Sequence, residues 1–248
     1  MRRIGLLGGT SWESSVDYYR LLNEGVRERL GGTHSADLLL RSVDFAEIEA
    51  KQVVDDWIGL GRRYASEANV LVNAGASVLG ICANTMHLLY DDVAAAGAPV
   101  VHVVDAVAEA ARKAGITTVG LLGTRYTMAS ADLYPARMAA HGIGVLVPEV
   151  DDAAEVHRII YDELVVGQVL PSSAEQLRGI IARLVDRGAQ GIVLGCTELG
   201  MIVEPPLSAV PLLDSLSLHV DALLDAALGA DASSPVPSEE PPLEEGAA

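Results

Sequence analysis

Short apolar runs alternate along this chain with stretches that have the period of a helix, and this alternation restricts the fold more than any other feature. Most of the runs end in glycine or in a polar turn. The runs cover residues 3–9, 36–43, 77–82, 98–104, 117–124, 144–149, 191–196 and 209–214. Strands that are apolar on both faces belong to parallel sheets covered by helices on both sides. The pattern therefore predicts an α/β protein with mainly parallel sheets flanked by helices.

Two of the intervening stretches, 11–32 and 173–190, are clearly amphipathic and predict helices. The second has a serine pair, with Ser173 as its second member, suited to cap its N-terminus. Glu175 stands in the expected first turn and Gly188 at the far end. The last residues, 231–248, are rich in proline and acidic side chains and show no periodicity. This composition predicts a disordered tail.

The sequence also repeats itself. "IGLLGGT" at 4–10 returns as "VGLLGTR" at 119–125, and the strand before the first cysteine returns as "IVLGCT" at 192–197. The spacing is about 115 residues in both cases. We interpret this as an internal duplication that gives two pseudo-symmetric α/β subdomains facing each other across a cleft. Chance similarity between ordinary α/β strands is the alternative.

Each half has one cysteine directly after an apolar strand, Cys82 and Cys196. The carboxyl end of a parallel strand lies near the N-terminus of the next helix, where free N–H groups favour an anion. This position is expected to lower a thiol pKa. It also predicts a cradle for a carboxylate, made by the N–H groups and side chains of Asn84, Thr85 and Thr197.

Two thiols on either side of a bound carboxylate suggest one reaction above others. The proton α to a carboxylate is a weak acid, and its removal needs a base together with donors for the developing charge. If one thiolate takes the proton from one face and the other thiol returns one to the opposite face, the stereocentre inverts. Cys82 and Cys196 are therefore the predicted catalytic pair.

The sequence gives little support for a nucleotide, metal or pyridoxal phosphate site. The chain has no G-x-G-x-x-G or phosphate-binding loop motif, no H-E-x-x-H or C-x-x-C pair, and only two lysines, Lys51 and Lys113, for a pyridoxal phosphate Schiff base. We therefore expect neither a metal nor another cofactor. The net charge of −17 argues against a nucleic-acid surface. Two free thiols and the lack of about 18 consecutive apolar residues predict a cytoplasmic protein without a membrane span.

Several segments together resemble the aspartate/glutamate racemase family, in particular its aspartate racemase and broad-specificity amino-acid racemase branch. They are "GLLGGTSWESSVDYYRLLNEG", "SVDFAEIE", "ANTMH", "LLGTRYTM", "IIYDELVVGQ" and "GCTEL". The resemblance spans roughly 1–230. It implies a first subdomain of 1–102 plus about 212–230, a second of 103–211, a cofactor-free amino-acid racemase and a homodimer. It assigns Cys196 as the second catalytic thiol, and it places in the substrate pocket Ser11, Asn84, Thr85, Thr124, Thr127 and Thr197.

The first thiol departs from the family pattern. In many relatives the cysteine directly precedes Asn-Thr, but here Ala83 has that place and Cys82 lies one residue earlier. Consecutive residues of a strand point to opposite faces, so only a kink or bulge would bring Cys82 into the cleft. If Ala83 faces the cleft instead, the enzyme has one thiol. Water or Thr85 is then a poor second base, and racemisation is slow or biased.

The substrate side chain is a second point of departure. Aspartate-specific relatives have two basic groups here. Lys51 is near the first position, with Gln52 beside it as a hydrogen-bonding substitute, and apolar Val165 has the second. A single basic residue argues against strict dicarboxylate specificity, so the expected substrates are aspartate, glutamate or a wider set of amino acids. Glu198 either orients the thiols or is an ordinary acidic residue of a first helical turn.

Two other functions share the predicted fold. One is a non-racemising paralogue that binds a small carboxylate, and the other is a related isomerase or decarboxylase that acts on a small diacid.

Overall fold

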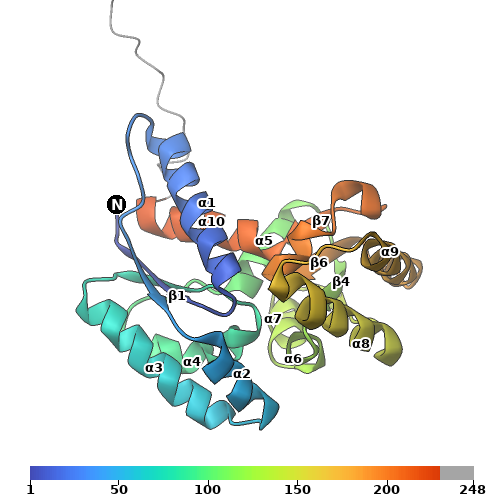
Figure 1. Ribbon diagram of the computed structural model, residues 1–248. Helices are drawn as coiled ribbons and strands as arrows, with labels where there is room; N and C mark the ends of the chain where they lie inside the picture. Colours follow the sequence, from blue (N-terminus) through green and yellow to red (C-terminus); the bar gives the residue numbers. More distant parts are fainter. Residues whose placement is uncertain (230–248) are drawn as a thin grey trace, which may run out of the picture.

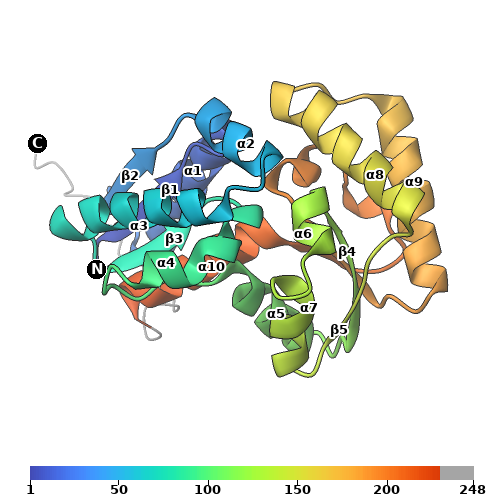
Figure 2. The same cartoon turned by 90° about the horizontal axis from the view of Figure 1, so that it is seen from below.

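The computed structural model describes residues 1–229, so the acidic tail expected at 231–248 lies outside the described residues. Two parallel sheets form the centres of two lobes that lie side by side in both views (Figure 1, Figure 2). The first has the strand order β2-β1-β3 and the second β5-β4-β6-β7. The strands are β1 (Ile4–Gly8), β2 (Leu38–Ser42), β3 (Val78–Ile81), β4 (Thr118–Gly123), β5 (Gly144–Leu146), β6 (Gly191–Gly195) and β7 (Leu212–Asp214). This confirms the predicted α/β class with two subdomains.

Helices cover both sheets. The first half contains α1 (Trp12–Leu30), α2 (Phe45–Val53), α3 (Trp57–Asn73), the 3-10 helix η1 (Thr85–Leu89) and α4 (Tyr90–Ala94). The second half contains α5 (Val103–Lys113), α6 (Arg125–Ala129), α7 (Tyr134–Ala140), α8 (Val150–Arg158), the π-helical turn η2 (Ile159–Glu163), η3 (Leu164–Val166), α9 (Pro171–Asp186), η4 (Thr197–Met201) and η5 (Pro205–Leu207). The last helix is α10 (Ser215–Leu228). None of the helices within 1–229 has the length and apolar character that a bilayer crossing needs.

The first sheet is buried on both faces. One face packs with α1 and α10, and the other packs with α3 and α4. The second sheet and its helices share a single apolar cluster, to which α5 contributes from its first residue, Val103. Strand β7 pairs with β6 in the second sheet, and α10 packs with α1 against the first sheet. The predicted subdomain boundaries stay a prediction.

Two local predictions differ from the structure. The run 98–104 forms only one bridge, Leu79 to Val100, because α5 begins at Val103 with His102 as its N-cap. Helix α9 begins at Pro171, before the predicted serine cap, with proline in the first turn where a missing N–H costs nothing. Ser173 instead donates to Glu163 at 2.6 Å. Gly188, at a φ of 103°, directly follows the C-cap as predicted.

The turn after β1 depends on glycine. Gly9 has a φ of 97°, and a Cβ at this position would collide with the backbone carbonyl of Val43. Only glycine combines this conformation with such a close approach. The turn delivers Ser11 to the start of α1, where Ser11 is the N-cap.

Buried histidines lie where the chain passes between the subdomains. His87 is hydrogen-bonded to Ala83 O at 2.9 Å and accepts from the Val103 N–H at 3.2 Å. His219 contacts Val101 O at 2.9 Å and Tyr18 Oη at 2.7 Å. Each ring uses one nitrogen as a donor and the other as an acceptor, which is the pattern of neutral imidazole. Burial lowers the pKa of His87 to about 4 and that of His219 to about 3.

Stability should therefore fall in mild acid. The pKa of a histidine in the unfolded chain is about 6.5. Below this pH the unfolded chain therefore binds protons at these histidines, whereas the folded chain does not until the pH reaches their lower pKa values. At pH 5 this costs roughly 2 kcal/mol of unfolding free energy for each of the two histidines. Urea unfolding at pH 7.5 and pH 5 measures the difference. His87→Gln should reduce this difference in unfolding free energy, and His34→Gln, at an exposed site, should leave it unchanged. Equal unfolding free energies of the wild type at the two pH values would contradict the expectation.

Candidate active site

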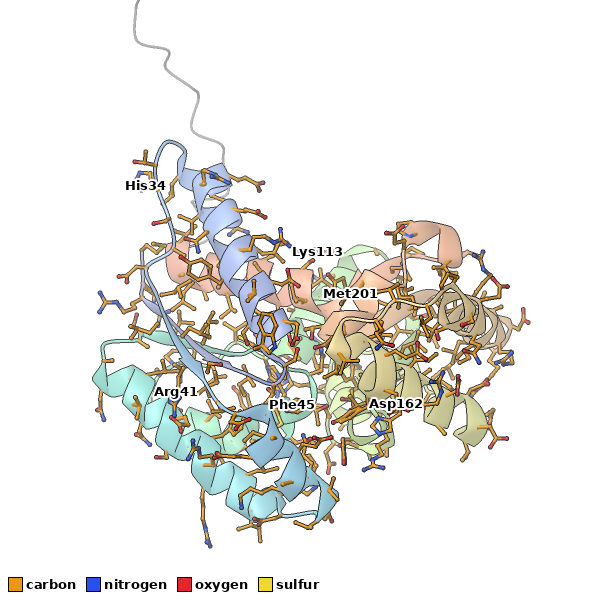
Figure 3. The ribbon with its side chains drawn as sticks, viewed as in Figure 1. His34, Arg41, Phe45, Lys113, Asp162 and Met201 are labelled. Carbon is orange, nitrogen blue, oxygen red and sulfur yellow. The ribbon has the colours of Figure 1, made fainter. Side chains whose placement is uncertain are left out.

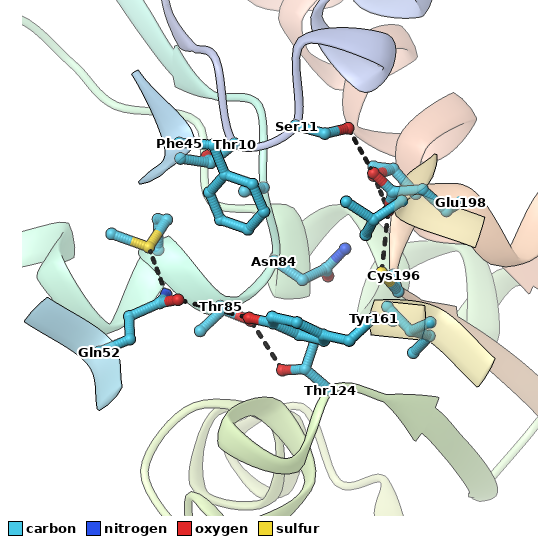
Figure 4. A pocket seen from close by; sticks show the side chains of 16 residues that line it. Thr10, Ser11, Phe45, Gln52, Asn84, Thr85, Thr124, Tyr161, Cys196 and Glu198 are labelled. Atoms are coloured by element: carbon cyan, nitrogen blue, oxygen red, sulfur yellow. Dashed lines mark hydrogen bonds between the residues drawn. The ribbon is translucent and has the colours of Figure 1, made fainter. Parts of the chain in front are cut away.

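A pocket with a volume of about 40 Å³ lies between the two subdomains (Figure 4). Both halves contribute to it. The first provides Thr10, Ser11, Phe45, Gln52, Ala83, Asn84, Thr85 and Met86, and the second provides Thr124, Ile160, Tyr161, Val165, Gly195, Cys196, Thr197 and Glu198. The structure thus collects most of the predicted site residues in one place, and their roles stay predictions.

Cys196 follows β6 and is the N-cap of η4. Its Sγ donates to Glu198 Oε2 at 2.9 Å. Burial raises the pKa of Cys196 well above its usual value, and the negative charge and hydrogen bond of Glu198 raise it further. Backbone N–H groups lower this pKa, as expected for a helix N-terminus, but burial and Glu198 outweigh them. The shift of this pKa is therefore opposite in direction to the one expected from the position at the strand end.

Glu198 connects the two halves at the thiol. It is 5% exposed and accepts from Thr197 Oγ1 at 2.8 Å and, through its other oxygen, from Ser11 Oγ at 2.6 Å. Ser14, in the first turn of α1, adds a weaker bond at 3.3 Å. The carboxylate therefore holds the Cys196 side chain and the N-terminus of α1 in fixed positions.

The strand registers identify the counterpart of Cys196. In the first half Leu7 of β1 stands opposite Ile81 of β3. In the second half Leu122, its equivalent in the repeat, stands opposite Leu194 of β6. Cys196 lies two residues beyond Leu194, and the residue two beyond Ile81 is Ala83. Ala83, and not Cys82, therefore has the place that mirrors the second thiol.

Burial gives the same answer. Leu79, Ile81 and Ala83 belong to the apolar cluster on the α3 face of the sheet, and Cys82 belongs to the cluster on the α1 and α10 face. The alternation of burial between the two faces thus continues through residue 83, although the strand pairing of β3 ends at Ile81. Cys82 is fully buried, does not line the pocket, and has its pKa strongly raised by burial. The prediction that Cys82 faces the cleft is wrong for this geometric reason.

Hydroxyl groups gather beyond Ala83. Thr85 Oγ1 lies 2.9 Å from both Thr124 Oγ1 and Thr127 Oγ1, so the cluster joins η1 to α6. Thr85 and Thr124 line the pocket, whereas Thr127 is fully buried behind them and supports them. These groups donate hydrogen bonds but are not bases at neutral pH.

Asn84 is held by both subdomains. Its Nδ2 donates to Ser215 Oγ at 2.8 Å, and its Oδ1 accepts from Tyr134 Oη at 2.6 Å. Ser215 in turn donates to Leu194 O at 2.6 Å. The amide therefore has a fixed orientation, with its second N–H and the neighbouring backbone left for a ligand.

Lys51 does not reach the pocket. It forms an ion pair with Asp56 at 2.6 Å, and its side chain is 42% exposed. Gln52 is 4% exposed and lines the pocket. Successive residues of a helix differ by about 100° in direction, so α2 turns only one of the two inward. The prediction of Lys51 as a substrate-binding residue is thus not supported.

Sequence reasoning did not single out Thr10, Phe45, Met86, Ile160 and Tyr161. Phe45 from the first half and Tyr161 from the second have ring centroids 6.4 Å apart. Phe45 faces the segment that contains Asp162 (Figure 3). Phe45 lies in the segment "SVDFAEIE" and Tyr161 in "IIYDELVVGQ", both of which resemble the racemase family. This resemblance was the only feature of the sequence that could have marked them as pocket residues.

Neutralising Glu198 should make Cys196 more acidic. In Glu198→Gln the charge that raises the thiol pKa is lost, and a fall of one pKa unit gives about tenfold more thiolate. Iodoacetamide alkylation at pH 8, in a Cys82→Ala background with one thiol, measures this. Glu24→Gln removes a surface charge as a control. Equal alkylation rates would show that Glu198 does not govern the thiol.

The fold and the pocket together define a racemase-type α/β enzyme with its thiol between two subdomains. The family model for Asp/Glu/Hydantoin racemases matches residues 7–223, and the chain belongs to this family.

Solved structures agree with this assignment. A protein from Yersinia pestis, provisionally described as an Asp/Glu racemase, is 43% identical with a TM-score of 0.86, over 92% of this chain and all of the other. An aspartate racemase homologue from Pyrococcus horikoshii is 35% identical with a TM-score of 0.79, at the same coverage. The aspartate racemase of Picrophilus torridus, at 18% identity, covers 92% of this chain and 94% of its own with a TM-score of 0.71, and shares the fold.

Proposed function

We propose that this protein is an amino-acid racemase without a cofactor that uses one thiol, Cys196, to exchange the α-proton of its substrate. The observation that supports it most directly is the equivalence of Ala83 and Cys196 in the two sheets. One side of the pocket has an acid–base group, and the mirror position has a methyl group. This arrangement favours proton transfer on one face of the substrate.

The reaction begins with the removal of the thiol proton. Glu198 Oε2, 2.9 Å from Sγ, is the acceptor. The thiolate then takes the α-proton, and the electrons of the C–H bond move into the carboxylate as an enolate. Hydroxyl and N–H donors at Thr85, Thr124 and Thr197 stabilise the charge that develops there.

The stereochemical outcome depends on which side returns a proton. Return from Cys196 regenerates the starting enantiomer, with deuterium at Cα once the thiol has exchanged with D₂O. Inversion needs a proton from the Ala83 side, where water is the donor in place of a positioned acid. Exchange with retention should therefore be faster than racemisation.

Exchange in D₂O tests this function. Pure L- and D-amino acids are incubated with the protein, without pyridoxal phosphate, and followed by proton NMR and chiral chromatography. Deuteration with retention, much faster for one enantiomer, is the expected result. Rapid inversion from both enantiomers would contradict the one-thiol mechanism. Saturable binding without any exchange would indicate a carboxylate-binding paralogue, and release of CO₂ from a small diacid would indicate a decarboxylase.

The homodimer implied by the family resemblance is part of the proposal. Light scattering of the full chain tests it, since a monomeric mass at micromolar concentration would contradict it.

A further inference from the structure

A second pocket lies where η1 and α4 of the first half meet α5 and α7 of the second. Its volume is about 360 Å³, and its lining includes Tyr90, Asp91, His102, Asp132, Leu133 and Arg137. It shares no lining side chain with the pocket that contains Cys196. A single water molecule needs only about 10–15 Å³. The second pocket therefore has room for a small organic ligand.

His102 presents a free hydrogen-bond donor to this pocket. The residue is 5% exposed and is the N-cap of α5, with its Nδ1 accepting from the Val104 N–H at 3.1 Å. Burial lowers the pKa of His102 to about 2, so the ring is neutral and its hydrogen is on Nε2. Within residues 1–229 this Nε2 has no hydrogen-bond partner, whereas every fully enclosed side-chain N or O atom there has one. The Nε2–H is therefore open to the pocket that the ring lines.

Arg137 adds a second donor near this histidine. Its Nε and Nη2 donate to the two carboxylate oxygens of Asp105 at 2.7 and 2.6 Å, which balances its charge and leaves Nη1. The guanidinium carbon lies 5.0 Å from the centre of the Tyr90 ring, and the centre of the His102 ring also lies 5.0 Å from it. Both donors thus lie beside the same aromatic ring. Two adjacent N–H donors, one of them on a charged group, suit a carboxylate.

Asp91 and Asp132 give the pocket an excess of negative charge. Both side chains are exposed and line the pocket, and neither forms a salt bridge in the described part of the chain. Because Asp105 already balances Arg137, a ligand with more than one ammonium group would offset these two carboxylates. Tyr90 adds an apolar surface on which an aliphatic chain can pack.

We propose that this pocket is a binding site for a cationic amino acid of the lysine or ornithine type. The ligand carboxylate accepts hydrogen bonds from His102 and Arg137. Its two ammonium groups pair with Asp91 and Asp132, and its methylene chain packs on the apolar lining. The free N–H of the histidine and the two carboxylates each gain a partner in this way. The site is separate from the proposed racemase reaction and does not depend on it.

Calorimetry on the wild-type chain tests the ligand class with three probes that share one carbon chain. L-Lysine has all the recognised groups, L-norleucine lacks the side-chain ammonium, and cadaverine lacks the carboxylate. Lysine should bind at least about tenfold more tightly than either of the others. Binding of norleucine or cadaverine as tight as that of lysine would contradict the proposed recognition. Absence of lysine binding at millimolar concentrations would overturn the site.

Substitutions of the two carboxylates test where lysine binds. The double variant Asp91→Asn, Asp132→Asn should weaken lysine binding by at least about tenfold. Asp92→Asn is the control, because Asp92 is the exposed neighbour of Asp91 in α4 and does not line the pocket. It should leave lysine affinity unchanged. Thermal melting verifies that the variants are folded, and equal lysine affinity in the wild type and the folded double variant would overturn the proposal.

His102→Asn tests the donor itself. Asparagine can still cap α5, but it has no N–H in the place of Nε2. Lysine affinity should fall by at least about fivefold, whereas cadaverine affinity should be unchanged. An unchanged ratio of the two affinities in the folded variant would contradict the role of His102.

Cα exchange separates this site from the active site. The double aspartate variant should keep the wild-type exchange rate within about twofold, because neither residue lines the pocket of Cys196. Joint loss of lysine binding and exchange in the folded variant would contradict a separate site. If the wild type shows no exchange at all, the proposed function fails, and the lysine measurements still decide this proposal.

Discussion

Replacing Cys196 by serine should reduce Cα exchange by at least about 1,000-fold. The hydroxyl is nearly isosteric with the thiol, so the pocket should keep its shape, but its pKa is too high for it to act as a base beside Glu198. Glu198, the proton acceptor for the thiol, is held in place by Ser11 and Thr197, and in the proposed mechanism it reaches the α-proton only through Cys196. Deuterium incorporation measured by NMR at saturating substrate gives the rate.

Cys82→Ala is the matched control for the loss of a thiol. Cys82 packs among apolar side chains on the far face of the first sheet, so its removal should leave exchange within about twofold. It should lower the unfolding free energy by about 1 kcal/mol through the small cavity that it leaves. Loss of exchange in this variant with an intact fold would restore Cys82 to the mechanism and contradict the structure.

Introducing a cysteine at position 83 should convert one-sided exchange into inversion. Ala83 lines the pocket at the position equivalent to Cys196, so Ala83→Cys supplies the missing acid on the second side. A positioned general acid typically contributes 10²–10⁴-fold, and we expect racemisation to rise by at least about 100-fold. Polarimetry or chiral chromatography from each pure enantiomer measures the change.

The double variant Cys82→Ala, Ala83→Cys tests whether position or number of thiols matters. It has two thiols, as the wild type does, but one of them is moved by a single residue, from the core at position 82 to the pocket at position 83. Racemisation equal to that of Ala83→Cys is expected. If both variants fold and neither inverts substrate faster than the wild type, the proposed equivalence of the two sides has no catalytic meaning.

Much of the site was predictable because glycine and apolar patterns mark where strands end. Asn84, Thr85, Thr197 and Glu198 follow directly on such strands, and parallel strands bring their carboxyl ends to a common edge. The aromatic and aliphatic wall was not predictable. Phe45 and Tyr161 lie in different subdomains and meet only in the folded chain, so no local pattern connects them.

The sequence by itself determined the α/β class and the division into two related halves, since both follow from local periodicity and from a repeat of about 115 residues. It also determined which strands and turns bear the polar groups. Only the tertiary structure decided that Ala83 and not Cys82 faces the pocket, and that Gln52 and not Lys51 points inward. The physical reason is the same in both cases. Neighbouring residues on a strand or helix point in different directions, so a one-residue ambiguity in the sequence is resolved only by strand register and packing.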